Sequence, residues 1–591
     1  MKMSRKILSF VILLALTAVI LLIPGCNRAD GTDAALVLTN GIIYTVDGDN
    51  WHNEPAEAVA VCADGLILFV GTAANAERFI GRDTQVIDLE GQVMFPGFID
   101  THIHVPGSML TYLFKIYLYE SGTLEQTLAD VAAFIDANPD NDEYWGIGYS
   151  PAIGSDPRGP RAEWLDEICS EKPIILISND EHSYWMNSVA LAMNGITPDT
   201  LVPPGGSIPI DPETGKLWGT LTGATAVITM ERPAYTMEQQ LEAMLRFQEN
   251  MHGWGFTSAM CLVPHFIDNE AYLAFYESGQ LALRLNLAGG QYEPGWDFDE
   301  VVGEAMVWRE ALRGNELLRV SSMKIFADGV VEGMTAYLSE PYDAAAGLEP
   351  GFRSDFNWDI AELKDIAARM VAEGFQLYIH TIGDAATTEM MNILEYIKAQ
   401  NPNTDHRTVF AHLQLVSDND KTRMGRLGVI GNTQPFWHIR APGWFDEVEL
   451  ILLGEERAMT MYPVRSLIDA GVTVTFSGDH PVTANNNPFW AIEAAVTRNL
   501  YSGELGAPDI TDIDDPTWLL NPDERISVKQ AIEAYTINGA YQLFRENEIG
   551  SITVGKRADF IVVDLDIFNI NPLDISETQV MMTFFNGERV R

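Results

Sequence analysis

Two histidines one residue apart end an apolar run in the stretch "GFIDTHIHV", residues 97 to 105. Side chains two positions apart lie on the same face of a strand, so His102 and His104 can both reach one ion. Taken alone, a histidine at a strand end is more often a packed or hydrogen-bonded residue than a ligand. The pair therefore predicts a metal site only if distant segments bring further ligands to it.

Further candidate ligands also end apolar runs, namely His380, His412 and Asp479, while Lys324 lies within a fourth run, "SSMKIFADG". Zn²⁺ prefers imidazole nitrogens together with a carboxylate. Asp479 is suited to bind the metal and to take a proton from water, whose pKa a bound ion lowers from 15.7 to about 7.

Lys324 is the least expected member, because a cation repels an ammonium group. Three interpretations stay open. Lys324 reacts with CO₂ and bridges two metals as a carbamate, it stays uncarboxylated and donates a hydrogen bond beside a single metal, or it is an ion-paired or snorkelling lysine at a strand end.

Eight apolar runs that alternate with amphipathic helices must position these residues. We predict strands at 97–102, 255–260, 281–287, 320–326, 375–380, 408–412, 429–434 and 472–478. In a (β/α)8 barrel, functional side chains gather at the carboxyl ends of the strands, and the candidate ligands fall there. The predicted fold class is therefore α/β, a TIM-like barrel over residues 94–545.

Two more strand-like runs, 144–149 and 173–178, would raise the number of barrel strands to ten. We therefore assign about 110–245 to an insertion after the first barrel strand. Within it, Thr214-Gly215 predicts a hairpin.

Short strands and tight turns occupy both ends of the chain, at 36–93 and 546–591. Asn40-Gly41 and Asp64-Gly65, each between apolar runs, predict hairpins. The two ends are expected to combine into one small β-sandwich beside the barrel.

The first 25 residues have the layout of an export signal, with Lys2, Arg5 and Lys6 before an apolar stretch. "LLIPGC" resembles a bacterial lipoprotein signal, which implies lipidation of Cys26 and an exported protein anchored on the extracytoplasmic side of the membrane. An ordinary cleaved signal or an uncleaved anchor are the alternatives.

The composition of the 591-residue chain, 47% hydrophobic and 20% charged, fits one large catalytic domain with appendages. The 83 acidic and 37 basic residues give a formal charge of −46. Such a surface repels nucleic acid and anionic lipid headgroups, so a lipid anchor is the expected membrane contact. A homodimer stays open.

Motifs along the whole chain resemble one family. "VIDLEGQVMFPGFIDTHIH", "MKIFADG", "IHTIGDAA", "FAHLQLVSDND", "NTQPFW", "FSGDHPV" and "GSITVGKRADFIVVD" occur in the order found in the amidohydrolase superfamily, in the YtcJ-like branch of its amidohydrolase-3 group. The resemblance covers about residues 36 to 591. One departure is "SGDHP", where Gly478 stands between the serine and the aspartate of the usual Ser-Asp-x-Pro.

This resemblance implies a divalent metal, expected to be zinc as one or two ions. The implied ligands are His102, His104, His380 and His412, with Lys324 as a carboxylated bridge and Asp479 as the catalytic aspartate. The stretch "NDEHSYWMNSVAL" is similar to a family segment that places His182 and Asn187 at the substrate, with capping or other local structure as the alternative role for both residues. Tyr149, Trp437 and His438 are further candidates for the substrate pocket.

The implied reaction is hydrolysis of a non-peptide C–N bond, with small N-substituted amides as the expected substrates. A cyclic amidase or deaminase on the same scaffold is the alternative, and a non-catalytic small-molecule-binding lipoprotein is a remote one. A barrel of this kind hosts many chemistries, so the fold alone does not choose the substrate.

Overall fold

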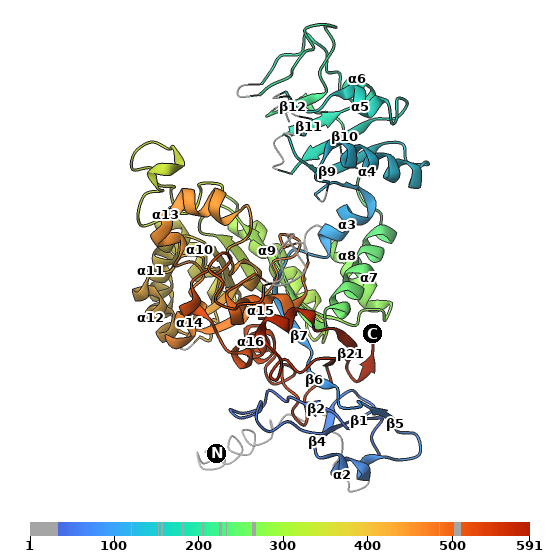
Figure 1. Cartoon of the computed structure of the whole chain (residues 1–591), viewed down its shortest axis with the longest axis vertical. Helices are drawn as coiled ribbons and strands as arrows, with labels where there is room; N and C mark the ends of the chain where they lie inside the picture. Colours follow the sequence, from blue (N-terminus) through green and yellow to red (C-terminus); the bar gives the residue numbers. More distant parts are fainter. Residues whose placement is uncertain are drawn as a thin grey trace, which may run out of the picture.

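The structure is a computed structural model that describes residues 33–591 except 120, 152, 155, 157, 180–182, 204–205, 224–226, 232, 263–266, 403, 484 and 501–509. The predicted signal peptide and Cys26 lie outside the described residues. The chain forms three parts: a central barrel, a five-stranded sheet at one end of the molecule, and a small β-sandwich at the other (Figure 1).

Eight parallel strands form the barrel sheet in the order β19-β18-β17-β16-β15-β14-β13-β7. They match the eight predicted strands, which confirms the α/β barrel fold. Their bounds are β7 Phe98–Ile103, β13 Phe256–Cys261, β14 Arg284–Tyr292, β15 Leu318–Phe326, β16 Gln376–Thr381, β17 Val409–His412, β18 Ile430–Thr433 and β19 Thr473–Phe476.

Amphipathic helices cover the outside of this sheet. The pattern in "AELKDIAARMVAEG" places Leu363, Ile366 and Met370 on one buried face of a single helix, as a 3.6-residue period requires. The helices that follow the insertion are α7 Met237–Gly253, α8 Asn269–Glu277, α9 Phe298–Ala311, α10 Ile360–Ala372, α11 Asp384–Gln400, α12 Asp418–Leu427, α13 Leu450–Ala458, α14 Val464–Asp469, α15 Pro488–Thr497, α16 Val528–Tyr535 and α17 Ile537–Gln542.

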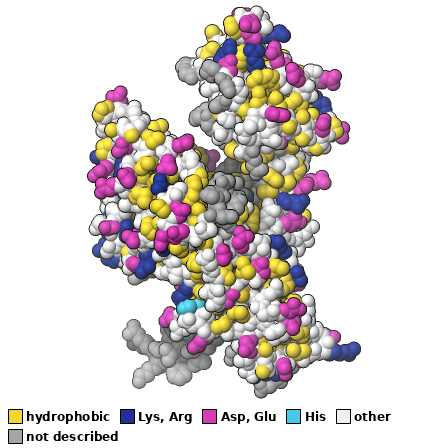
Figure 2. Space-filling model, viewed as in Figure 1, with side chains coloured by type: hydrophobic (Ala, Val, Ile, Leu, Met, Phe, Trp, Pro, Cys, Tyr) yellow, Lys and Arg dark blue, Asp and Glu magenta, His cyan; other side chains and the backbone are white. Residues whose placement is uncertain are grey.

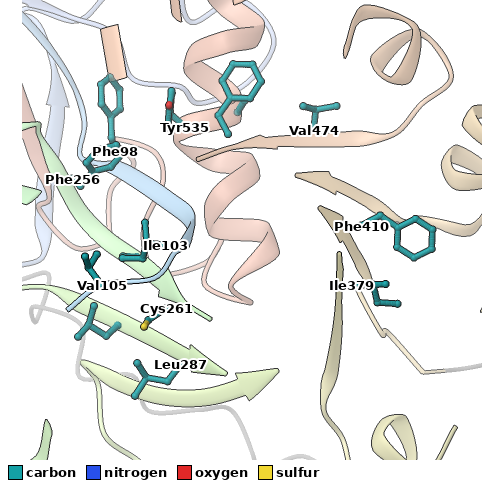
Figure 3. Close-up of a cluster of buried hydrophobic side chains, with 14 of the residues drawn as sticks. Phe98, Ile103, Val105, Phe256, Cys261, Leu287, Ile379, Phe410, Val474 and Tyr535 are labelled. Atoms are coloured by element: carbon teal, nitrogen blue, oxygen red, sulfur yellow. The ribbon is translucent and has the colours of Figure 1, made fainter. Parts of the chain in front are cut away.

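An apolar layer holds the strands to these helices (Figure 3). At the start of β7 and β13, Phe98 and Phe256 pack against Tyr535 of α16, with ring centroids 5.6 and 5.8 Å from the tyrosine ring. Burial of such large side chains contributes about 1.5–3 kcal/mol each, so this layer holds the starts of β7 and β13 against α16.

The first and last barrel strands meet through specific hydrogen bonds. The hydroxyl of Thr101 on β7 donates to the carbonyl oxygen of Phe476 on β19 at 2.8 Å. Just beyond the strand ends, the Asp479 amide donates to the His102 carbonyl at 3.0 Å. These contacts bring the loop after β19 directly over the end of β7.

The segment between β7 and β13 builds a separate sheet in the order β12-β11-β10-β9-β8. The runs at 144–149 and 173–178 become β9 and β10 of this sheet and add nothing to the barrel. Asp211 and Lys216 pair across the predicted Thr214-Gly215 turn. The elements are α3 Gly107–Phe114, β8 Ile116–Tyr117, α4 Leu124–Ala137, β9 Tyr144–Tyr149, α5 Ala162–Asp166, β10 Ile174–Ser178, β11 Ser183–Met186, α6 Ser188–Met193 and β12 Thr220–Thr222.

Both chain ends contribute to the sandwich, as expected. One sheet holds β1 Leu36–Thr39, β3 Ala58–Val61, β4 Ile67–Gly71 and β5 Gln85–Asp88, with the short helix α2 Ala73–Ala76 between β4 and β5. The other sheet holds β2 Ile42–Ile43, β6 Val93–Pro96, β20 Phe560–Val563, β21 Val580–Phe585 and β22 Glu588–Arg589.

One turn prediction is wrong. Asp64-Gly65 does join the antiparallel pair β3 and β4, but Asn40-Gly41 does not make a hairpin. It leads from β1 in the first sheet to β2 in the second, with Asn40 in the left-handed region at φ 59°. The left-handed turn is real, but the partners of β1 are β3 and β5.

Acidic side chains are spread over the face shown in Figure 2 among apolar and neutral ones, and histidine is scarcely visible there. Among the described helices, none is both long and apolar enough to cross a membrane.

Candidate active site

Three histidines surround the Asp479 carboxylate at the carboxyl end of the barrel. The Oδ1 atom of Asp479 lies 3.2 Å from Nε2 of His102 and 2.8 Å from Nε2 of His104. Its Oδ2 atom lies 4.0 Å from Nδ1 of His412. The loop after β19 therefore places this carboxylate against the ends of β7 and β17.

The fourth predicted histidine extends the cluster. Ring centroids lie 5.4 Å apart for His104 and His102, 4.9 Å for His102 and His412, and 4.4 Å for His412 and His380. The four imidazoles thus form one continuous group, built from the ends of β7, β16 and β17.

Two of these rings are oriented by hydrogen bonds that use one ring nitrogen each. Nε2 of His380 lies 3.0 Å from the carbonyl oxygen of Gly329, to which it must donate, because a carbonyl only accepts. Nδ1 of His412 lies 3.0 Å from Oε1 of Gln434. Each ring keeps its other nitrogen for a ligand, the arrangement that orients metal-binding histidines.

Lys324 on β15 joins the same group. It is 1% exposed, and its Nζ lies 4.8 Å from the ring centroid of Phe326 and 5.3 Å from that of Tyr378. Burial lowers the pKa of Lys324 to about 7, although the charge of Asp479 opposes the shift. A large fraction of this amine is therefore neutral near pH 7, the form that reacts with CO₂.

The histidines share the same electrostatic environment. Burial first, and then the charge of Lys324, holds the pKa of His102 well below its ordinary value. Burial and the same lysine lower the pKa of His380 to about 3. Burial, with His380 next, also lowers that of His412. The imidazoles of His102, His380 and His412 are therefore neutral at physiological pH, as metal ligands must be.

Several polar atoms at the centre of this group have no hydrogen bond from any described residue. They are both ring nitrogens of His102, Nζ of Lys324 and Oδ1 of Asp479, whose short contacts with the imidazoles of His102 and His104 do not have hydrogen-bond geometry. A buried polar group without a partner costs about 1–3 kcal/mol, so four such atoms together need an explanation. Ligand atoms of His102, His412 and Asp479 lie within 4.8 Å of one another, which fits a divalent cation held by imidazole and carboxylate.

A carboxylate missed by the sequence analysis supports the end of β7. Asp100 is fully buried and accepts hydrogen bonds from the His102 amide at 3.0 Å, the Gly478 amide at 3.2 Å and Nδ2 of Asn486 at 2.8 Å. It ties the histidine strand to the loop that carries Asp479. Its place in "FIDTHIH", two residues before His102, was the available signal.

The Gly478 that departs from the family pattern has a packing reason. A Cβ atom at this position would lie 1.9 Å from Oδ1 of Asn486. The glycine therefore makes room for the asparagine that holds Asp100.

The predicted substrate residues separate into two groups. Trp437 stacks on the His412 ring at 5.7 Å and 18°, and its Nε1 donates to Thr483 in the loop after β19. His438 is fully buried, and its ring stacks on that of Tyr462 with centroids 5.1 Å apart.

The structure does not bring the insertion residues Tyr149 and Asn187 to the histidines. Tyr149 is buried in the insertion core against Trp185. Asn187 caps α6: its Oδ1 accepts from two amides and its Nδ2 donates to two carbonyls. A side chain whose hydrogen bonds are all used in this way supports local structure rather than binding substrate. His182 lies outside the described residues.

A barrel of eight parallel strands, with imidazoles and a carboxylate that fit a divalent cation at their carboxyl ends, is the arrangement typical of a metal-dependent hydrolase. The profile of the amidohydrolase family matches residues 85–591. The chain therefore belongs to the amidohydrolase family, and it is a hydrolase of carbon–nitrogen bonds.

Individual relatives support this assignment. The chain is 28% identical to N-substituted formamide deformylase of Arthrobacter pascens, over 93% of this chain and 97% of that one. It is 27% identical to Protein LONG AFTER FAR-RED 3 of Arabidopsis thaliana, over 95% and 92% of the two chains. An uncharacterized metal-dependent hydrolase from Pyrococcus horikoshii has the same fold, with a TM-score of 0.68, 21% identity, and coverage of 94% and 100%.

Proposed function

We propose that this protein hydrolyses small N-substituted amides, with zinc as its metal. The observation that carries the proposal is the position of Asp479, whose Oδ1 lies within 3.2 Å of two imidazole nitrogens at the open end of the barrel. The deformylase named above, which aligns along nearly its whole length, supports N-substituted formamides as the first substrates to test.

The residues that would hold the metal are His102, His104, His380, His412 and Asp479, with Lys324 as a bridge if it carries CO₂. A bound divalent ion supplies Lewis acidity, which polarises a carbonyl oxygen and lowers the pKa of water.

Asp479 takes the proton of the attacking water and later returns it to the departing nitrogen. Proton return is needed because the C–N bond breaks readily only when the nitrogen leaves as a neutral amine. Trp437, stacked on His412, offers the amide an apolar wall beside the reacting carbon. The products are a carboxylic acid, formic acid in the simplest case, and a free amine.

The experiment is a screen of N-formyl and N-acyl amines with zinc-loaded protein, scored by release of amine. Asp479→Asn is the control, because it keeps the shape of the side chain and removes its basicity. We expect turnover to fall by about 10²–10⁴-fold, the usual contribution of a general base, while zinc content stays near the wild-type value. Retained turnover in the variant would remove Asp479 from the mechanism.

The second candidate is a cyclic amidase or deaminase on the same scaffold. Ammonia released from a ring compound, with no amine released from any open-chain amide, would favour it.

Other assignments from the sequence are part of the same proposal. We assign the chain to the YtcJ-like branch, with a lipoprotein signal over residues 1–25, a lipid on Cys26, and a place outside the cytoplasmic membrane of a bacterium. Mass spectrometry of the mature N-terminus tests the lipid, and light scattering tests whether the protein is a homodimer.

A further inference from the structure

A chain of buried side chains leads from His412 into the barrel. Nε2 of Gln434 donates to Oδ1 of Asn432 at 2.8 Å and to Oγ of Ser477 at 2.9 Å. Nδ2 of Asn432 donates to the hydroxyl of Thr101 at 2.8 Å. All four of these side chains are within 1% of complete burial, so water does not compete for their hydrogen bonds.

The direction of these hydrogen bonds is fixed at the far end. The Thr101 hydroxyl has one proton and gives it to the Phe476 carbonyl, which can only accept. Thr101 must therefore accept from Asn432, which turns the Asn432 amide nitrogen toward Thr101 and its oxygen toward Gln434.

The hydrogen bonds of Thr475 support the same orientation of the Asn432 amide. Thr475 gives its proton to Oε1 of Gln542 at 2.6 Å, so it also accepts from Nδ2 of Asn432, at 3.3 Å. The Ser477 hydroxyl donates to the same oxygen of Asn432 at 3.1 Å. The asparagine has one orientation that satisfies all of its neighbours.

The orientation of the Asn432 amide also fixes the orientation of the Gln434 amide. Its amide nitrogen faces Asn432 and Ser477, so its oxygen faces His412. An amide oxygen only accepts, so Nδ1 of His412 must carry a proton.

We propose that Gln434 is a positioning residue that holds His412 as its Nδ1–H tautomer, which leaves the lone pair on Nε2 available to bind a metal. The inference rests on the metal-dependent function proposed above. It adds that Thr101, Asn432 and Ser477 determine which ring nitrogen of His412 carries the proton. This effect does not require a bound metal.

The test uses the full chain and three variants. Gln434→Leu keeps the volume and removes the acceptor, whereas Gln434→Glu keeps an acceptor for His412. Gln376→Leu is the matched control: Gln376 is a buried barrel glutamine whose Nε2 donates to the carbonyls of Arg407 and Gln542, and it contacts no predicted metal ligand.

The first measurement is the tautomer of His412 in metal-free protein, by ¹⁵N NMR of histidine-labelled chain. The His412 signals are those missing from a His412→Gln variant. We expect Nδ1–H in the wild type, in Gln434→Glu and in Gln376→Leu, and a mixture or Nε2–H in Gln434→Leu.

The second measurement is zinc affinity, by competition with a chelator. The affinity should fall about 10–100-fold in Gln434→Leu and stay within a few-fold of the wild-type value in Gln434→Glu and Gln376→Leu.

An unchanged His412 tautomer in Gln434→Leu would overturn the inference, and so would an equal loss of zinc affinity in Gln376→Leu. The tautomer is read without metal or substrate. A wild-type chain with the Nδ1–H form but no metal-dependent hydrolysis would therefore reject the proposed function and leave the tautomer assignment standing.

Discussion

Asp328 allows a stringent test of how the loops above the histidines are held. It follows β15, is fully buried, and accepts hydrogen bonds from the amides of Ile382 at 3.0 Å, Gly383 at 2.8 Å and Tyr337 at 3.0 Å. It therefore joins the loops after β15 and β16, and it lies in "FADG" four residues after Lys324. We predict that Asp328 stabilises the fold and takes no part in the reaction.

The size of the effect follows from these three bonds. Asp328→Ala leaves three buried amides without an acceptor, at about 1–3 kcal/mol each, so roughly 3–9 kcal/mol before relaxation. Asp328→Asn replaces one oxygen by an NH₂ group and loses at least one acceptor, which costs roughly 1–3 kcal/mol. Asp359→Asn is the control, because Asp359 caps α10 at the surface and asparagine caps equally well.

The stability effect should also depend on pH. Burial raises the pKa of Asp328 from its ordinary value of 3.8 to about 7. The unfolded chain loses this proton near pH 4, whereas the folded chain keeps it to about pH 7. The stabilisation is thus complete below pH 4 and declines as pH rises to 7, by at most about 1.4 kcal/mol per pH unit.

The assay is urea unfolding of the wild type and the three variants at pH 5 and pH 8. The urea midpoints are compared, because a chain of this size need not unfold in two states. At pH 5 the midpoint should fall in the order Asp359→Asn, Asp328→Asn, Asp328→Ala, and the deficit of Asp328→Asn relative to wild type should be smaller at pH 8 than at pH 5. An Asp328→Ala midpoint equal to the wild-type value, or a deficit that grows with pH, would refute this account.

Three further predictions concern the metal and Asp479. Lys324→Ala should lose metal and recover part of its activity with added acetate; wild-type metal content in the variant would reject a bridging lysine. Gly478→Ala should lower kcat/KM by at least about tenfold, because the new Cβ displaces Asn486, and Asn486→Ala in the same chain should restore part of the loss; a fully active Gly478→Ala would contradict the packing argument. Removing the metal with a chelator should lower the melting temperature, since free metal at 100 times its Kd stabilises by about 2.7 kcal/mol, and an unchanged melting temperature would argue against the site.

The barrel was predictable because its apolar runs and helical periods are long and regular. The same regularity located most of the candidate ligands, because a barrel leaves few places where a polar side chain can follow a buried strand. His102, His380, His412 and Asp479 were found in this way without a contact being known. Lys324 was harder to interpret, since the pKa of a lysine depends on its burial, which the sequence alone does not show.

The residues that hydrogen-bond to the candidate ligands could not be found from their position after a buried strand. Gln434 and Asn432 lie in "GNTQPFW", where nothing local shows that they bond to His412 and to Thr101, 331 positions away from Asn432 in the chain. Asn187 shows that one motif can leave two roles open. Its segment is similar to one that lies at the substrate, and the structure shows the alternative role, because Asn187 is the N-cap of α6.

Asp100, Thr101 and His102 show how closely fold and site are joined here. Thr101 holds β7 to β19 and also ends the hydrogen-bond chain that orients His412. Asp100 and the His102 carbonyl, on either side of it, bond to Gly478 and Asp479. Three consecutive residues thus close the barrel and hold the segments that carry Asp479 and the candidate ligands His102 and His412. A change in how β7 meets β19 is therefore expected to alter metal binding as well as the fold.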